Sequence, residues 1–150
     1  MKVVIQRVNM ASVAINGEIH NRIGQGLLVL LGIGTTDDQA DIDYIVQKTL
    51  GLRVFPNQDG KMNLSLDEIQ GEVLLISQFT LLASTKKGNR PSYINAAPPV
   101  LAIPIYEKII STINERIGAR LKTGVFGADM KISLINDGPV TIQIDSKHKD

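Results

Sequence analysis

The chain has 150 residues, a formal net charge of +1, a hydrophobic content of 43% and 21% charged residues. This length and composition are typical of one folded domain, residues 1–150, and exclude a disordered protein. The chain has no cysteine, which excludes disulfides, thiol catalysis and cysteine-ligated zinc. A protein that grips a long nucleic acid by its phosphates normally carries a strong basic excess. Either nucleic acid is not the partner, or only a short piece of it is bound.

The sequence shows no export or membrane-spanning signal. The residues after Met1 lack a long apolar stretch followed by a small-residue cleavage site. The longest apolar run, residues 27–31, is far too short to cross a bilayer. We therefore expect a soluble, cytoplasmic protein with no membrane partner.

The first third of the chain predicts strands. Residues 3–8 and 12–15 are rich in β-branched residues, and Asn16-Gly17 is a strong hairpin signal. Residues 27–31 are continuously apolar, which predicts a strand covered on both faces.

A helix is predicted next. Side chains at 36–38 can cap its start, and apolar residues recur at helical spacing from Ile42 to Leu50. Gly51 marks its end. Residues 52–55 then predict a short strand.

The order of strand and helix is repeated in the second half. Residues 73–76 predict another buried strand, and a loop rich in Lys, Gly, Asn and Pro follows over 83–99. A second helix should begin between Pro99 and Pro104, because proline is tolerated only in a first turn.

Two strands, 130–135 and 140–144, end the chain. The complete order predicts an α+β fold, with a mostly antiparallel, β-barrel-like sheet and two helices packed outside it. The hairpin-rich opening disfavours a doubly wound parallel sheet.

The usual catalytic motifs are missing. His20 and His148 have no partner at metal-ligand spacing, and neither a nucleophile elbow nor a phosphate-binding loop occurs. Gly32 and Gly34 complete no dinucleotide fingerprint and are interpreted as turn glycines. Acidic residues at 37–43 suit the positive end of a helix. An enzyme with this sequence would act by positioning and by backbone hydrogen bonds, and no metal or cofactor is predicted.

Two polar segments could supply such bonds. Residues 77–81, Ser-Gln-Phe-Thr-Leu, leave a buried strand and could aim backbone N–H groups at an oxyanion. Residues 136–141, Asn-Asp-Gly-Pro-Val-Thr, place Gly-Pro between two strands. The residues alone favour simpler structures, an alternating strand and a tight turn.

The loop at 83–99 carries positive charge. Lys86, Lys87 and Arg90 surround a Gly-Asn pair and can approach phosphates. Tyr93 could stack on a base. A solvated surface loop explains the same residues equally well.

Together these segments resemble the D-aminoacyl-tRNA deacylase family. Residues 77–81 and 136–141 match the family's two signature segments in the expected order. Further matching stretches are 6–8, 11–13, 27–32, 60–64, 90–92 and 123–130. The resemblance covers nearly the whole chain, and it favours the functional interpretation of both segments over the simpler ones.

The resemblance implies a homodimer with an active site at each end of the subunit interface. Each site would hydrolyse the ester of D-aminoacyl-tRNA, and glycyl-tRNA is an additional candidate substrate. Gly138 and Pro139, joined by a cis peptide bond, would enter the partner's site and hold the substrate's α-amino group with backbone carbonyls. L-amino acids would be rejected there. Arg7 would brace this segment.

The same resemblance assigns the chemistry. The backbone N–H groups of Gln78 and Phe79 would form the oxyanion hole, and Ser77 and Thr80 would shape and polarise the site. The ribose 2′-hydroxyl of the tRNA would help to activate water. Thr80 is an alternative nucleophile, although no base is visible to activate it.

The tRNA would be held by its 3′ end. Phe126 would line the pocket of the terminal adenosine, and Lys86, Lys87 and Arg90 would contact the same end of the RNA. Binding of the end alone accounts for a net charge near zero, because few phosphates need neutralising.

Two rival functions remain open. A binding module with this fold would bind charged tRNA without turnover. A hydrolase of small esters would use Ser77 or Thr80 and would need no RNA, but it lacks a suitably placed histidine.

Overall fold

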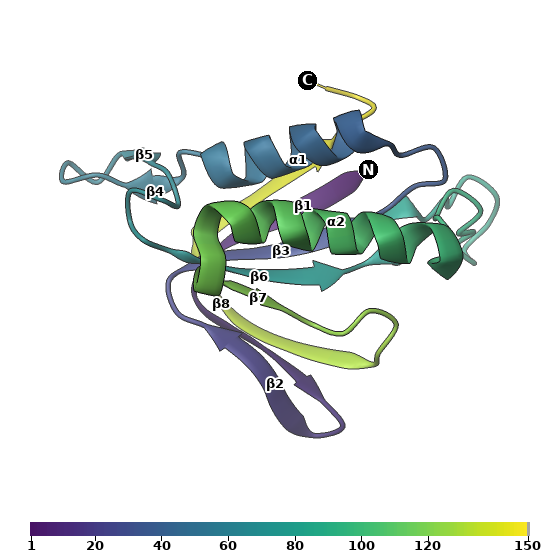
Figure 1. Ribbon diagram of the computed structural model, residues 1–150, viewed down its shortest axis with the longest axis horizontal. Helices are drawn as coiled ribbons and strands as arrows, with labels where there is room; N and C mark the ends of the chain where they lie inside the picture. The colour runs from purple at the N-terminus through teal and green to yellow at the C-terminus, as the bar shows by residue number, and fades with distance from the viewer. Residues whose placement is uncertain (150) are drawn as a thin grey trace.

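The structure, a computed structural model, describes residues 1–149. Its strands are β1 (Lys2–Ile15), β2 (Glu18–Ile23), β3 (Gly26–Gly32), β4 (Phe55–Pro56), β5 (Met62–Leu64), β6 (Glu72–Ser77), β7 (Leu121–Thr123) and β8 (Met130–Asp145). Its helices are α1 (Gln39–Gly51) and α2 (Pro99–Ile117), with short 3-10 turns η1 (Phe79–Leu82) and η2 (Gly118–Arg120). Both helices lie on the same side of the sheet, and the β1–β2 hairpin extends away from them (Figure 1).

Strand β1 organises the main sheet. Its residues 2–8 pair with β3 and its residues 11–15 pair with β2. Strand β8 runs antiparallel along the other edge of β1, from Lys2 to Ile15. Because β1 pairs with β3 in its first half and with β2 in its second half, the sheet curls into a barrel-like shape, as the sequence predicts.

The sheet is mixed, so the prediction of a mostly antiparallel sheet was too simple. Strands β3, β6 and β7 are parallel neighbours. The chain passes through α1 between β3 and β6, and through α2 between β6 and β7. A helical crossover returns the chain to the same end of the sheet, which makes the next strand parallel to the last one.

Two apolar clusters cover the two faces of β3, which confirms the predicted buried strand. Leu27, Val29 and Leu31 pack under the helices, whereas Leu28 points into a second cluster inside the curled part of the sheet. Strand β6 alternates in the same way between the two clusters. Burial of each such side chain contributes about 1.5–3 kcal/mol.

Helix α1 begins as its capping residues predict. The side chain of Asp38 accepts hydrogen bonds from the backbone N–H groups of Ala40 (3.0 Å) and Asp41 (3.3 Å). The side chain of Asp41 in turn accepts from the Asp38 N–H at 2.9 Å, which completes a capping box. Gly51 is the last helical residue, as expected.

Helix α2 begins at Pro99, within the predicted range, but Pro104 lies inside the helix. Pro104 has no N–H to donate to the preceding turn, a loss that the buried face of the helix offsets. Tyr106 on that face donates a hydrogen bond to the Leu75 carbonyl at 3.2 Å, and burial raises the pKa of its phenol to about 12. The buried residues are Ala102, Tyr106, Ile109, Ile113 and Ile117.

Three strand predictions had the wrong bounds. The strands expected at 3–8 and 12–15 are one strand, β1, and those at 130–135 and 140–144 are one strand, β8. Strands β1 and β8 pair with each other on both sides of their irregular positions, so each continues as one strand. The short strand expected at 52–55 starts only at Phe55, where β5 provides a partner. No helix within residues 1–149 is long and apolar enough to cross a membrane.

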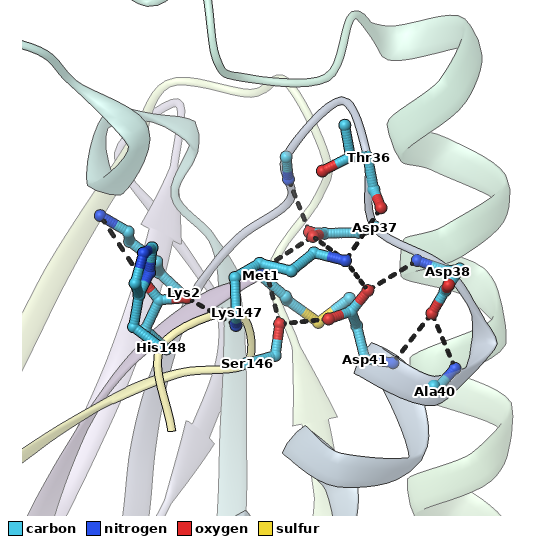
Figure 2. A network of polar contacts seen from close by, with 12 residues as sticks. Met1, Lys2, Thr36, Asp37, Asp38, Ala40, Asp41, Ser146, Lys147 and His148 are labelled. Carbon is cyan, nitrogen blue, oxygen red and sulfur yellow. Dashed lines mark hydrogen bonds and ion pairs between the residues drawn. The ribbon is translucent and has the colours of Figure 1, made fainter. Parts of the chain in front are cut away.

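A polar network ties the two ends of the described chain to α1 (Figure 2). The Asp41 carboxylate accepts hydrogen bonds from Ser146 Oγ (2.5 Å) and Lys147 Nζ (2.6 Å). The Met1 amine donates to Asp37 Oδ1 (2.6 Å) and to Ser146 Oγ (2.9 Å). Burial raises the pKa of Asp41, but its hydrogen bonds with Lys147 and Ser146 outweigh that effect and hold the pKa well below its usual range.

The substitution Asp41→Asn should therefore destabilise the protein in a pH-dependent way. At pH 7 we expect a loss of roughly 1–3 kcal/mol in the free energy of unfolding, because charge-assisted hydrogen bonds are broken. The folded-state pKa lies below the unfolded value, so the carboxylate contributes fully above about pH 4. As the pH falls towards the folded-state pKa, the two proteins should become equally stable. Urea unfolding curves between pH 7 and pH 2.5 measure this difference.

Asp43→Asn is the matched control, because Asp43 lies on the same helix and accepts only an exposed bond from Gln39. It should change stability by less than about 0.5 kcal/mol. A difference between wild type and Asp41→Asn that stays constant down to pH 2.5 would contradict the assignment of the lowered pKa.

Candidate active site

The segment after β6 turns sharply instead of continuing as a strand. The pairing of β6 with β3 ends at Ser77 and Leu31. The backbone N–H of Gln78 still donates to the Leu31 carbonyl at 2.6 Å, and the chain then enters the 3-10 turn η1. The alternating strand that residues 77–81 favour on their own is therefore wrong beyond Ser77.

Gly32 makes this turn fit against β3. A Cβ atom at position 32 would clash with Leu82 Cδ2 and would lie 2.9 Å from the Gln78 carbonyl oxygen. The residue is thus a point of close approach between two segments, not the turn glycine that the sequence indicated. Nothing in the local sequence signals this role, since the atoms that require it belong to the segment 78–82.

Two backbone N–H groups in the turn are free to bind a ligand. Phe79 and Thr80 open the 3-10 turn, and their N–H groups have no acceptor among residues 1–149. The expected pair was Gln78 and Phe79, but the Gln78 N–H is already bonded to Leu31. Of the expected pair, only the Phe79 N–H is without an acceptor in the described part of the chain, and the Thr80 N–H is the other unbonded group in the turn. A role of these groups in an oxyanion hole stays a prediction.

The Thr80 hydroxyl is held by a neighbouring amide. Gln78 Nε2 donates a hydrogen bond to Thr80 Oγ1 at 2.5 Å. A nucleophilic hydroxyl needs a base that accepts its proton, whereas an amide nitrogen only donates. Within residues 1–149, no side-chain base is hydrogen-bonded to Thr80.

A cavity of about 250 Å³ opens beside the turn. Ser77, Gln78 and Phe79 form one wall, and Phe126 and Met130 lie on another. The ring of Phe126 packs against Tyr106 of α2, with ring centroids 5.7 Å apart. The cavity is slightly smaller than a typical small-molecule site, about 300–1,000 Å³, so it suits one nucleoside-sized group rather than a folded macromolecule.

The basic loop is anchored next to this cavity. Ser84 and Ser92 exchange backbone hydrogen bonds of 2.8 and 2.9 Å, which close the intervening loop at its base. Just beyond the closure, the ring of Tyr93 meets that of Phe79 edge-on, with centroids 5.0 Å apart. Tyr93 therefore packs on a cavity residue, a contact that the sequence did not reveal. Lys86, Lys87 and Arg90 are exposed on the closed loop.

The Gly138-Pro139 segment lies elsewhere, in the middle of β8. Its peptide bond is cis, and both residues are exposed. Arg7 Nε donates to the Asp137 carbonyl at 2.9 Å, and Arg7 Nη1 donates to the Val54 carbonyl at 2.5 Å. The Arg7 side chain is only 10% exposed, so this contact is well shielded from solvent. Arg7 is thus in contact with the segment, and its role as a bracing residue stays a prediction.

The structure thus groups some expected site residues and separates others. Met130 lines the cavity at the start of β8, and Gly138 lies eight residues further along the strand. At about 3.3 Å per residue, the strand path between them is roughly 26 Å. Arg7, Gly138 and Pro139 are absent from the lining of the cavity that contains Ser77, Gln78, Phe79 and Phe126. No cluster of metal-ligating side chains occurs in the part of the chain that the structure describes.

Comparison with known proteins finds relatives that match the chain along its whole length. The sequence profile of the family described as D-Tyr-tRNA(Tyr) deacylase matches residues 4–145. A D-aminoacyl-tRNA deacylase of Flavobacterium psychrophilum is 55% identical over 150 residues, which is 100% of both chains. One from Cytophaga hutchinsonii is 57% identical over 149 residues, which is 99% of each chain.

Two solved structures share the fold. The c-Myc DNA unwinding element binding protein has a TM-score of 0.92 and 41% identity, covering 97% of this chain and 98% of its own. A probable eukaryotic D-amino acid tRNA deacylase has a TM-score of 0.81 at 17% identity, covering 95% and 97% of the two chains. From the profile match, and from identities above half over the whole of both chains, it follows that this chain belongs to the D-Tyr-tRNA(Tyr) deacylase family.

Proposed function

We propose that this protein is a hydrolase that cleaves the ester bond of D-aminoacyl-tRNA and so removes wrongly attached D-amino acids. The observation that carries the proposal is the pair of unbonded N–H groups at Phe79 and Thr80, in a turn whose first residue, Phe79, lines the same cavity as Phe126. Family membership supplies the class of reaction.

The free N–H groups would stabilise the transition state. Water attacks the ester carbonyl, the carbonyl oxygen becomes an oxyanion, and the bond to the ribose oxygen then breaks, with that oxygen taking up a proton. Two N–H donors fixed by a rigid turn can bind the oxyanion, and loss of one such donor typically costs about 10²–10³ in rate. Their support on β3 and β6 keeps them oriented before the substrate arrives.

The RNA itself would assist the attack of water. Thr80 accepts a bond from Gln78 and has no bonded base, which supports a mechanism without a threonine nucleophile. The 2′-hydroxyl of the terminal ribose, next to the scissile ester, is the remaining group that can orient water and relay its proton. Under this mechanism the protein contributes positioning and charge stabilisation.

Selection by chirality would need a second copy of the chain. Gly138 and Pro139 do not line the cavity of their own chain, which supports a second copy as the source of the Gly-Pro segment. In a homodimer, Gly138 and Pro139 would enter the partner's site and bind the substrate's α-amino group through backbone carbonyls. The side chain of an L-residue would then be driven into the wall of the site. Glycine has no side chain to clash, so glycyl-tRNA would also be a substrate.

Only the 3′ end of the tRNA would be bound. The cavity beside Phe126 accepts a terminal adenosine, and Lys86, Lys87 and Arg90 on the adjacent loop would contact its phosphates. The net charge of +1 fits this limited contact. The same charge disfavours the DNA binding that the name of one structural relative states.

Release of amino acid from D-Tyr-tRNA and L-Tyr-tRNA tests the function, with wild type and Thr80→Ala side by side. We expect rapid loss of the D-ester alone. The variant should keep its rate to within about tenfold, because one neutral hydrogen bond contributes roughly 0.5–1.5 kcal/mol. Removal of a nucleophile would cost on the order of 10⁴-fold or more, and that result would restore the threonine mechanism. Binding of both RNAs without hydrolysis would contradict the hydrolase proposal and favour a module that only binds charged tRNA.

Gly32→Ala should reduce kcat by roughly 10²-fold, because the added Cβ displaces the turn that presents the N–H groups. Gly24→Ala is the matched control: a Cβ there would meet only the carboxylate of Glu72, at 3.5 Å. The Gly24→Ala variant should keep the wild-type kcat. Equal kcat values for the two variants, with both proteins folded by circular dichroism, would contradict the role of the turn.

Complementation between subunits tests the shared site. In Gly138→Ala, a Cβ at φ +136° would lie 2.8 Å from Val140 Cγ2, so this variant should be strongly impaired, like Gly32→Ala. A heterodimer of the two variants, purified with two different tags, has one site built wholly from intact parts. It should recover about half of the wild-type activity per dimer. A heterodimer as impaired as the parents would show that Gly138 acts within its own chain.

A further inference from the structure

Strands β1 and β8 have different numbers of residues between their paired positions near Arg7. Gln6 of β1 pairs with Thr141 of β8, and Val8 pairs with Asn136. One residue of β1 therefore faces the four residues 137–140 of β8, which leave the ladder. Backbone groups in such a bulge need partners other than the neighbouring strand.

The side chain of Asn136, the last paired residue before the bulge, supplies some of these partners. Its Oδ1 accepts from the Val140 N–H at 2.8 Å. Its Nδ2 donates to Thr141 Oγ1 at 3.1 Å and, over a longer distance of 3.4 Å, to the Val140 carbonyl. The Asn136 amide thus connects the residue before the bulge to Val140, its last residue, and to Thr141 after it, and it uses its acceptor and its donor together.

The bulge is fixed from the β1 side as well. Arg7 holds the Asp137 carbonyl at 2.9 Å, and Gln6 Nε2 donates to Thr141 Oγ1 at 3.3 Å. Asn136, Asp137 and Val140 are partly buried, whereas Gly138 and Pro139 are exposed. Every contact in this set comes from the same chain, so the exposed tip is shaped before any partner binds it.

We infer that Asn136 is a positioning residue for chiral selection, acting by clamping Gly138-Pro139 in a rigid shape. The inference rests on the proposed function. A steric clash rejects an L-amino acid only if the Gly138-Pro139 segment cannot move away from its side chain. The hydrogen bonds of Asn136 prevent that movement. Removal of its amide leaves Arg7 to hold only the first part of the bulge, so the tip can move away from an L-side chain. The same loosening misplaces the carbonyls that bind the α-amino group of a D-residue.

The experiment compares kcat/KM on D-Tyr-tRNA and L-Tyr-tRNA for wild type, Asn136→Ala and Asn136→Asp. In Asn136→Ala the ratio of D to L should fall by about tenfold or more, the effect of two lost hydrogen bonds. Asn136→Asp keeps the acceptor for the Val140 N–H and should retain more of the ratio. Both substrates are assayed with one enzyme stock, so a loss of folded protein alone does not change the ratio.

Asn57→Ala is the matched control. Asn57 Oδ1 accepts from the N–H groups of Asp59 and Lys61, both at 3.0 Å, so it closes its own turn through a bond to the fourth residue on, as Asn136 does. This turn connects β4 and β5, and within residues 1–149 none of the hydrogen bonds of the Asn57 side chain reaches residues 136–141. Asn57→Ala should lower the melting temperature and leave the D/L ratio unchanged.

The possible results distinguish the positioning role of Asn136 from the proposed function. If the wild type is active and selective but Asn136→Ala keeps its D/L ratio, Asn136 is not a positioning residue and the proposed function stands. A ratio that falls equally in Asn57→Ala also overturns the assignment, because the effect then follows general destabilisation. If the wild type hydrolyses neither ester, the proposed function fails, and this inference fails with it.

Discussion

The parallel pairing of β3 with β6 is the interaction on which the candidate site depends. The two strands end at one edge, at Leu31 and Ser77, and Gly32 lets the following turn lie directly against β3. Apolar clusters on both faces fix the register, because a slip by one residue would exchange the faces of every side chain. A turn of only four residues thereby holds N–H groups in fixed directions, as oxyanion binding requires.

The pairing of β1 with β8 separates the parts of the site. The same strand lines the cavity at Met130 and carries Gly138 eight residues further along, near its middle. The mismatch opposite Arg7 makes the Gly-Pro segment project, and side chains of its own subunit hold it there. Rigidity in both parts is consistent with a proposed mechanism that uses positioning in place of acid-base side chains.

Local signals in the sequence predicted the elements that local physics controls. Asn16 and Gly17 adopt the positive φ angles, 52° and 80°, that their hairpin signal implies, and Asp38 caps α1. Predictions failed where a partner far along the chain decided the outcome. Residues 79–81 alternate like a strand, yet they form a 3-10 turn because β3 ends beside them. The parallel half of the sheet likewise follows from helical crossovers that periodicity alone does not place.

By itself, the sequence determined the α+β class, the buried strands, and two signature segments that were enough to indicate the family. It also indicated the near-neutral charge that limits nucleic-acid contact. Only the tertiary structure decided which N–H groups are free, because the acceptor of the Gln78 N–H is Leu31 on another strand. It alone brought Arg7 to Asp137 and Val54. Sequence patterns encode dihedral preference and the burial of one face, whereas a hydrogen bond depends on which distant group packing brings within reach.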